Sequence, residues 1–327
     1  MNSTPKLNKL YSALSILAFV AYLAYAPSAH AWGCEGHQTV ALLAEKHLTP
    51  SAKQALIKLM QDNPIDSTLT RRCGTDIADP FADASTWADD FRKLHPETGP
   101  MHFLDIPLSV NVPSNLEQFC DPGGCVTKAI RDKLLILKDK TKPGPDRAEA
   151  LRYILHFVGD VHQPLHGSNN GDRGGNCVPV KLSSRGTFHC TTAHKTYNPN
   201  LHSVWDNELV VRGMEGRTTD QYAADLDTEF ASEIPDWQGS ATDPIAWAWE
   251  SHQAAVDTAY GALPKHIAFE PNVNIKDCTE NNGIGKRMCD KRIRLSSEYQ
   301  DTAVGVIEER LAQAGIRLAM LLNDAAN

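Results

Sequence analysis

Helical periodicity runs through most of this chain and constrains its fold more than any other feature. Apolar residues recur three and four positions apart, the spacing that places side chains on one face of an α-helix. Strand patterns are confined to 178–182 and 186–190, which we expect to form a short β-hairpin. No internal repeat or linker interrupts the pattern. We therefore predict one all-α domain with helices over 38–47, 51–60, 83–93, 129–138, 146–165, 201–211, 219–232, 244–260 and 298–322.

The first 31 residues have the pattern of a secretory signal peptide. Lys6 and Lys9 precede an apolar stretch, 10–26, and Ala29-His30-Ala31 is a small-x-small cleavage site. The alternative is an uncleaved membrane anchor, but a spanning helix needs about 20 apolar residues and this stretch is short for one. We expect cleavage after Ala31, a mature domain of residues 32–327 and a secreted or periplasmic protein without membrane attachment.

All eight cysteines follow the predicted cleavage site. An even number in an exported chain indicates four disulfides, which would staple the long irregular segments between helices. Pairing of cysteines that are close in the sequence favours the disulfides Cys120–Cys125, Cys177–Cys190 and Cys278–Cys289. The two cysteines that remain, Cys34 and Cys73, would form the fourth. A zinc–thiolate site is the alternative, but cysteines of an exported chain are expected to be oxidised.

The charge balance limits how this chain can hold a partner. Forty acidic residues against 32 basic ones give a net charge of −8, and the predicted mature chain, without Lys6 and Lys9, carries −10. A general basic surface for nucleic acid is therefore excluded. The hydrophobic fraction of 42% also excludes a disordered protein.

The densest group of chemically active residues is the segment 156–166. His156 and Asp160 are four residues apart, so on a helix both side chains reach one cation. Pro164 can end that helix and let His166 turn toward a neighbouring position. His202 and Asp206 repeat the His/Asp spacing.

Each His/Asp pair alone could be a buried hydrogen-bonded pair, but both pairs together with His166 favour a metal site. Imidazole and carboxylate ligands without thiolate suit zinc, and manganese or iron would fit the same ligands.

With these motifs in their order, the chain resembles the secreted zinc-dependent single-strand nucleases and 3′-nucleotidases of the S1/P1 type, which are related to bacterial zinc phospholipases C. The resemblance implies their compact multi-helix fold. The motifs that carry it are Trp32-Gly33, Gly36-His37, Trp87-Ala88-Asp89, His102-Phe103, the segment 156–166, the glycine-rich loop 171–176 and the segment 200–206.

The resemblance implies three zinc ions. The first would be held by Asp89, His102, His156 and Asp160, and the second by His166, His202 and Asp206. The third would be held by the free α-amine and carbonyl oxygen of Trp32, by His37 and by a shared Asp160. Signal cleavage would then take part in assembling the site, because it creates the amine ligand.

The resemblance also implies the reaction. A hydroxide bridging two zinc ions would cleave the P–O3′ bond of single-stranded DNA or RNA and of 3′-nucleotides, leaving 5′-phosphate products. Arg92 would meet the transition-state phosphate and Asp105 would orient Arg92, although such a pair alone is more often an ordinary surface ion pair. Phe103 and Tyr197 would stack on bases, while Phe103 could equally be part of the core. Asn207 could contact phosphate or base, with an amide on the helix surface as the alternative.

Two other functions remain open at this stage. A zinc phospholipase C would use a related site, but the five-residue spacing from Trp32 to His37 and the aspartate at 206, where phospholipases use glutamate, favour the nuclease. An exported zinc-binding protein without catalysis is the second alternative, and Arg92 and Asp105 argue against it because neither would bind metal. We expect a monomer with no stable protein partner.

Overall fold

The computed structural model describes residues 32–75, 77–182, 199–240, 242–264, 278 and 290–326, and their regular structure is helical except for one small sheet, as expected for an all-α domain. The α-helices are α1 (Cys34–Lys46), α2 (Pro50–Asp62), α3 (Pro80–Ser85), α4 (Trp87–Leu94), α5 (Val126–Lys138), α6 (Gly144–His162), α7 (Leu201–Ser203), α8 (Leu209–Met214), α9 (Thr219–Glu229), α10 (Ile234–Gly239), α11 (Pro244–Ala254) and α13 (Ser297–Ala326). The 3-10 helices are η1 (Pro96–His102), η2 (Leu116–Phe119) and η3 (Pro164–His166), and the π-helices are η4 (Val204–Glu208) and η5 (Ala255–Tyr260).

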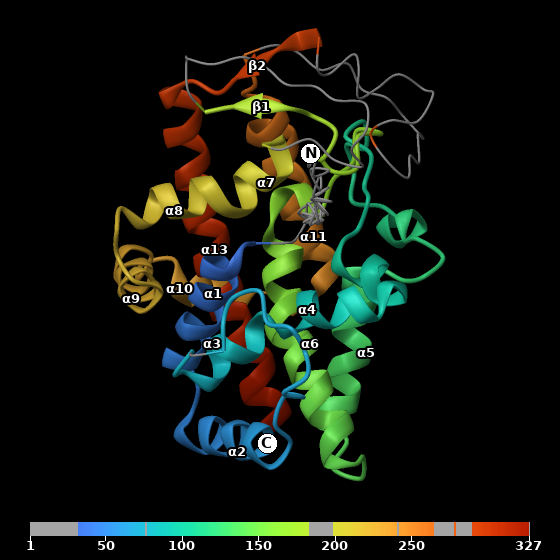
Figure 1. Cartoon of the computed structure of the whole chain (residues 1–327), viewed down its shortest axis with the longest axis vertical. Coiled ribbons are helices and arrows are strands. Elements are labelled where there is room, and N and C mark those ends of the chain that lie inside the picture. Colours follow the sequence, from blue (N-terminus) through green and yellow to red (C-terminus); the bar gives the residue numbers. More distant parts are fainter. Residues whose placement is uncertain are drawn as a thin grey trace, which may run out of the picture.

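Helix α6 forms the centre of the molecule (Figure 1) and packs against α5, α11, α13 and α3. Pro145 and Asp146 stand in its first turn, where the missing N–H of proline and the negative charge of aspartate both suit a helix N-terminus. From Leu151 to His162 every residue is buried. A helix that is covered on all sides can keep polar side chains only if they have partners inside the protein.

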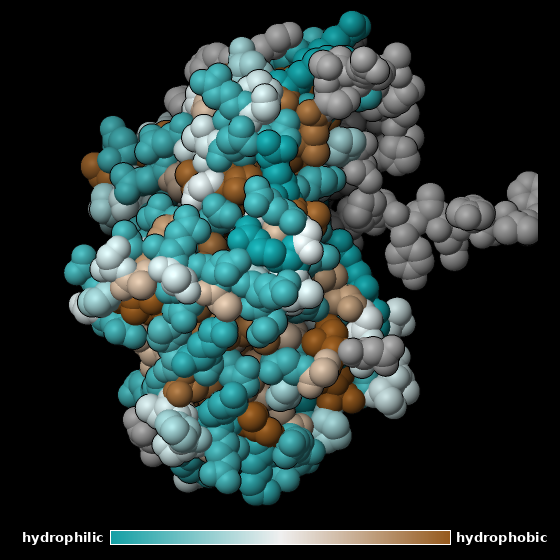
Figure 2. Space-filling model, turned by 90° about the vertical axis from the view of Figure 1, so that its left-hand side faces the viewer, coloured by the Kyte–Doolittle hydropathy of each residue, from teal (hydrophilic) through white to brown (hydrophobic). Residues whose placement is uncertain are grey.

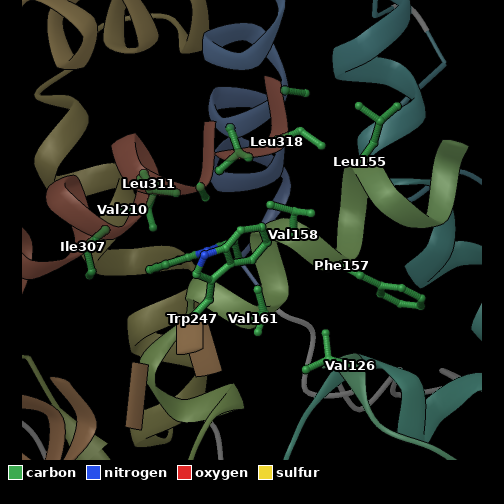
Figure 3. Packing of buried hydrophobic residues seen from close by; sticks show 14 of the residues in the cluster. Val126, Leu155, Phe157, Val158, Val161, Val210, Trp247, Ile307, Leu311 and Leu318 are labelled. Carbon is green, nitrogen blue, oxygen red and sulfur yellow. The ribbon is translucent and has the colours of Figure 1, made fainter. Parts of the chain in front are cut away.

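Much of the hydrophobic core lies where α6 packs against α11 and α13. Figure 3 shows Trp247 of α11 beside Val158 and Val161 of α6, with Leu311 of α13 close by, and all four side chains are at most 1% exposed. Burying side chains of this size stabilises the fold by about 1.5–3 kcal/mol each. Because α6 is packed between these helices, the polar residues on it are held in fixed positions.

The predicted helices are present, with differences at their ends. The segment 83–93 is divided into α3 and α4 at Thr86, and the segments 201–211 and 244–260 each change from α- to π-helix part of the way along. Helix α10 was not predicted, because Pro235 and Gly239 lie within its six residues and weaken the helical pattern.

One strand of the predicted hairpin is present. Strand β1 (Val180–Lys181) lies within the segment 178–182 and pairs in parallel with β2 (Ile293–Arg294), more than a hundred residues further along the chain. The segment 186–190, expected as the partner strand, lies outside the described residues, and the hairpin stays a prediction. The strand that leads into α13 was not predicted.

Three disulfides join described residues. Cys34–Cys73 and Cys120–Cys125 are the expected pairs. Cys177 is bonded to Cys278, so the expected pairs Cys177–Cys190 and Cys278–Cys289 are wrong. Closure between near neighbours failed here because the fold brings two distant loops together, with 5.1 Å between the Cα atoms of Cys177 and Cys278. Cys190 and Cys289 lie outside the described residues.

The surface is largely polar on the face turned to the viewer in Figure 2, where hydrophobic residues form small separate patches. Among the helices of the described ranges, none combines the length and the hydrophobicity that crossing a bilayer requires.

Candidate metal centre

Helix α6 supplies the first two residues of the centre. His156 and Asp160 are both fully buried, and one helical turn brings His156 Nε2 within 3.4 Å of Asp160 Oδ2. The Nδ1–H of His156 donates a hydrogen bond to the carbonyl oxygen of Ser85 at 2.7 Å, which fixes the ring. The predicted i,i+4 pair is therefore present.

Two further predicted ligands reach the same point from α4 and from the end of η1. Asp89 Oδ1 lies 3.7 Å from His156 Nε2 and 3.8 Å from His102 Nδ1. His102 Nδ1 lies 2.9 Å from Asp160 Oδ2. Three separate elements thus bring together the four residues expected for a first ion.

The amino-terminal segment reaches Asp160 from the other side. His37 Nε2 lies 3.4 Å from Asp160 Oδ1, and the His37 ring stacks on that of His156 with 3.8 Å between the ring centres. Trp32, fully buried, donates from its indole Nε1 to the carbonyl oxygen of Gly159 at 2.9 Å. A Cβ atom on Gly159 would lie 2.8 Å from His37 Nδ1, so only glycine allows this approach.

The second His/Asp group is built from η3, α7 and η4. His166 Nε2 lies 3.1 Å from His202 Nε2, and His202 Nε2 lies 3.4 Å from Asp206 Oδ2. All three residues are at most 5% exposed. Asp206 lies within the π-helix η4, an irregularity that often marks functional sites.

Hydrogen bonds decide which nitrogen of each ring faces the centre. His166 Nδ1 bonds the carbonyl oxygen of His102 at 2.7 Å, and His202 Nδ1 bonds that of Gly174 at 2.6 Å. A carbonyl oxygen only accepts, so each Nδ1 carries a proton, and in the neutral ring Nε2 then presents a lone pair. The two Nε2 atoms lie 3.1 Å apart, and a shared cation would stabilise both rings in the neutral form.

The electrostatics of the buried groups agree with this geometry. Burial lowers the pKa of His102 and of His166 well below the usual histidine value, and the charge of Arg92 on His102 and of His202 on His166 adds to the effect. Both rings are therefore neutral, as metal ligands must be.

Burial also raises the pKa of Asp160 and of Asp206 well above the usual aspartate value. The charge of Asp89 raises both further, while the hydrogen bond from Gln163 opposes the shift at Asp206. Divalent cations would favour the ionised carboxylates.

A carboxylate oxygen of the centre lacks a hydrogen bond within the described part of the chain. Asp160 Oδ1, the oxygen that faces His37, is buried and accepts no hydrogen bond there. A buried polar atom left in this state costs about 1–3 kcal/mol, so the residues present fit a bound metal better than an empty polar core. The groups whose ligand atoms converge are His37, Asp89 and His156; His102, His156 and Asp160; and His166, His202 and Asp206.

Of the predicted catalytic pair, Arg92 contacts a residue of this centre, and no hydrogen bond or ion pair between Arg92 and Asp105 is found among the described residues. Arg92 is half-buried on α4, and its Nη2 forms an ion pair with Asp89 Oδ1 at 3.1 Å. Asp105 follows η1, and burial raises its pKa to about 7 although the side chain of Asn169 donates a hydrogen bond to it. Nearby Asp172 adds to the rise.

The predicted base-site residues are only partly placed. Phe103 is half-buried directly after His102. Asn207 is half-buried beside Asp206, and its amide donates to the carbonyl oxygen of Ser203 at 3.0 Å. Tyr197 lies outside the described residues.

The sequence did not single out Gln163, whose side chain donates to Asp206 Oδ1 at 2.5 Å. The sequence did contain a signal for it. Gln163 stands between His162 and Pro164 in a largely apolar segment, and a side-chain amide that is buried there needs hydrogen-bond partners.

Fold and site together define an all-α protein with a buried His/Asp centre suited to metal ions. A family model described as S1/P1 Nuclease matches residues 32–327, and the chain belongs to this family.

Among curated proteins, Nuclease S1 of Aspergillus oryzae is 28% identical over 325 residues, covering 93% of this chain and 94% of the relative. Endonuclease 2 of Arabidopsis thaliana is 27% identical over 328 residues, covering 94% and 95%. Nuclease P1 of Penicillium citrinum is 24% identical over 299 residues, covering 90% and 97%. The chain is thus a nuclease that hydrolyses nucleic acid, and these matches favour that interpretation over a phospholipase.

Proposed function

We propose that this chain is an exported endonuclease that uses three zinc ions to hydrolyse P–O3′ bonds of single-stranded DNA and RNA, leaving 5′-phosphate products, with additional 3′-nucleotidase activity. The observation that carries the proposal is the pair of imidazoles, His166 and His202, whose Nε2 atoms face each other at 3.1 Å beside Asp206. Each Nδ1 already donates to a carbonyl oxygen, so two neutral rings would oppose two acceptors, and a cation bound between them would satisfy both.

The nine proposed ligands are those expected from the sequence: Asp89, His102, His156 and Asp160 for the first ion; His166, His202 and Asp206 for the second; and Trp32, His37 and Asp160 for the third. Zinc bound there supplies Lewis acidity, which lowers the pKa of a water nucleophile to near ~7 and stabilises charge on the phosphate. The hydrogen bonds to Ser85, His102 and Gly174 hold the imidazole rings in the tautomer that binding requires.

Arg92 and Asp105 act on the substrate rather than on metal. Arg92 is held against Asp89, so its remaining N–H groups can meet a phosphate at the centre and stabilise the charge that develops there. Asp105 orients Arg92. Its pKa of about 7 places its change of protonation state near neutral pH.

The preference for single strands comes from base stacking. A single strand offers its base faces to aromatic side chains, while a duplex hides them. We assign this contact to Phe103 and Tyr197, with Asn207 as a polar contact to base or phosphate. An acidic protein can hold nucleic acid in this way, because the attraction is concentrated at the centre.

Export completes the assembly of the centre. The disulfides Cys34–Cys73, Cys120–Cys125 and Cys177–Cys278 indicate an oxidising compartment. Removal of residues 1–31 would leave a mature domain, 32–327, whose Trp32 amine binds the third ion. We expect this domain to act as a secreted or periplasmic monomer without membrane attachment or a stable protein partner.

The test uses mature protein with Trp32 at its amino terminus, loaded with zinc. Single-stranded and duplex oligonucleotides are offered in parallel, and product ends are identified by mass spectrometry. We expect 5′-phosphate ends, faster cleavage of the single strand and loss of at least a hundredfold in rate for His202→Ala. The control is His47→Gln, which changes a histidine that pairs with Asp227 on the surface. Full zinc occupancy without phosphodiester cleavage would leave an exported zinc-binding protein and overturn the proposal.

A further inference from the structure

Two adjacent arginines differ in burial, because the side chain of Arg71 is buried and Arg72 is exposed. The Arg71 side chain is 5% exposed and bonds Asp83 Oδ1 at 3.0 Å and Asp90 Oδ2 at 3.3 Å, and it also bonds Thr86 Oγ1 at 3.1 Å. Arg72 is exposed, and its guanidinium has no hydrogen bond or ion pair with any residue in the described ranges. Arg71 therefore has a structural role, and Arg72 has none that these contacts explain.

The backbone of Arg72 is nonetheless held firmly. Its N–H donates to both carboxylate oxygens of Asp90, at 3.1 and 3.2 Å. Asp90 is 1% exposed and is itself fixed by Arg71 and by Lys93, whose Nζ lies 2.8 Å from Oδ1. On the other side, Cys73 is bonded to Cys34. An exposed cation is thus presented from a rigid loop, which reduces the entropy lost when it binds a ligand.

The two contacts that hold the backbone at Arg72, with Asp90 and through the disulfide Cys73–Cys34, each involve a residue next to the metal centre. Asp90 directly follows Asp89 on α4. Cys34 directly follows Gly33, whose N–H donates to the carbonyl oxygen of Asp206 at 2.7 Å.

We propose that Arg72 binds a backbone phosphate of the substrate strand adjacent to the scissile phosphate, an inference that rests on the nuclease function proposed above. Arg92, which forms an ion pair with Asp89, is the residue assigned above to the scissile phosphate. Guanidinium groups bind phosphate through two parallel N–H donors, and a fixed one gives both affinity and direction. With a net charge of −10 on the predicted mature chain, a local cation at the rim would offset repulsion of the strand.

The test compares substrates with different numbers of phosphates. A dinucleoside monophosphate contains only the scissile phosphate, and trinucleotides with one more phosphate on the 5′ or the 3′ side show which neighbour matters. For Arg72→Ala we expect KM to rise about three- to tenfold on one trinucleotide and to stay unchanged on the dinucleoside monophosphate, with kcat constant on both. The salt dependence of log KM should fall by about 0.7 per lost phosphate contact. Arg72→Lys should restore most of the affinity.

The matched control is Arg212→Ala, which removes another exposed arginine whose partner is Asp301 on the surface. It should leave both KM values unchanged. Equal KM values for wild type and Arg72→Ala on every substrate, or an equal rise on the dinucleoside monophosphate, would overturn the inference. Failure of the wild-type protein to cleave any substrate would instead contradict the proposed function, so the two failures are distinguishable.

Discussion

Gln163 and Asp206 lie 43 residues apart in the sequence, yet the side-chain amide of Gln163 donates to Asp206 Oδ1 at 2.5 Å. The amide oxygen of Gln163 accepts from the backbone N–H of Leu165, in the short turn η3 that ends with His166. One fully buried side chain therefore connects Asp206 with the turn that carries His166. This bond occupies Oδ1 and leaves Oδ2 facing His202.

We predict that Gln163→Leu lowers zinc affinity about 10- to 100-fold, the usual cost of removing a hydrogen bond that orients a ligand. The measurement is competition between apo-protein and a zinc chelator of known affinity. Gln300→Leu is the control, since Gln300 is also a buried glutamine but bonds the carbonyl oxygens of Leu182 and Leu295. Equal zinc affinity in both variants and the wild type would show that Gln163 only supports the fold.

The close approach of Gly159 and His37 gives a second prediction. Gly159→Ala should push His37 away, because the new Cβ would lie 2.8 Å from His37 Nδ1. We expect one zinc ion fewer per chain by native mass spectrometry, with the secondary structure unchanged. Gly305→Ala is the control, because a Cβ there meets no atom within 4 Å and alanine favours a helix by about 1 kcal/mol. Full zinc occupancy in Gly159→Ala would contradict the assignment of His37.

The pairs His156/Asp160 and His202/Asp206 could be predicted from the sequence because a helix alone brings residues i and i+4 together. The meeting of the second pair with His166 could not, since it depends on how α7 docks against the end of α6. The ordered motifs of a known family supplied that information instead. Gln163 was missed for the same reason, because its partner is set by tertiary structure.

The errors in the fold have a related cause. Pairing of near neighbours predicts Cys177–Cys190, on the assumption that short loops close on themselves, and it gives no sign of the strand β2. In the structure, Cys177 and β1 meet residues about a hundred positions later in the chain, at Cys278 and at β2. Such contacts join segments that are far apart in the sequence, which no local pattern encodes.

The role proposed for the amino group of Trp32 leads to a third prediction. A free α-amine has a pKa near ~7.7–8.0, so zinc can displace its proton at modest cost, whereas an amide nitrogen is no comparable ligand. Adding one alanine before Trp32 should therefore lower occupancy of the third ion and reduce activity at least tenfold. Zinc content by mass spectrometry and the cleavage rate are measured on the same samples. Unchanged occupancy and rate would contradict the amine ligand.

A network behind the centre connects α11 with α13. Glu250 of α11 lies 2.8 Å from Arg310 Nη1 and 2.9 Å from Arg317 Nη2, and both arginines are at most 4% exposed. Arg317 also contacts His162 Nε2 at 3.0 Å, at the end of α6. Burial raises the pKa of Glu250, but the hydrogen bonds and charges of Arg317 and Arg310 outweigh it and leave the pKa lowered.

This network gives a prediction for the stability at low pH. Because the pKa of Glu250 is lower in the folded protein than in the unfolded chain, where it is about 4.3, its contribution is complete above that value. It is lost as the pH falls from there through the folded pKa. Glu250→Gln should cost about 3 kcal/mol of unfolding free energy at pH 7, because two buried arginines lose their counter-charge. The difference from wild type should shrink below about pH 4.

Urea unfolding of both proteins between pH 3 and 7 measures this difference directly, and taking the difference removes the shared effect of zinc release in acid. Asp62→Asn is the control, since the exposed pair of Lys58 and Asp62 should contribute less than about 1 kcal/mol. If Glu250→Gln unfolds like the wild type at pH 7, the two arginines are solvated in some other way and the network does not hold α13 against α11. A difference that stayed constant down to pH 3 would instead show that the charge of Glu250 is not what stabilises the contact.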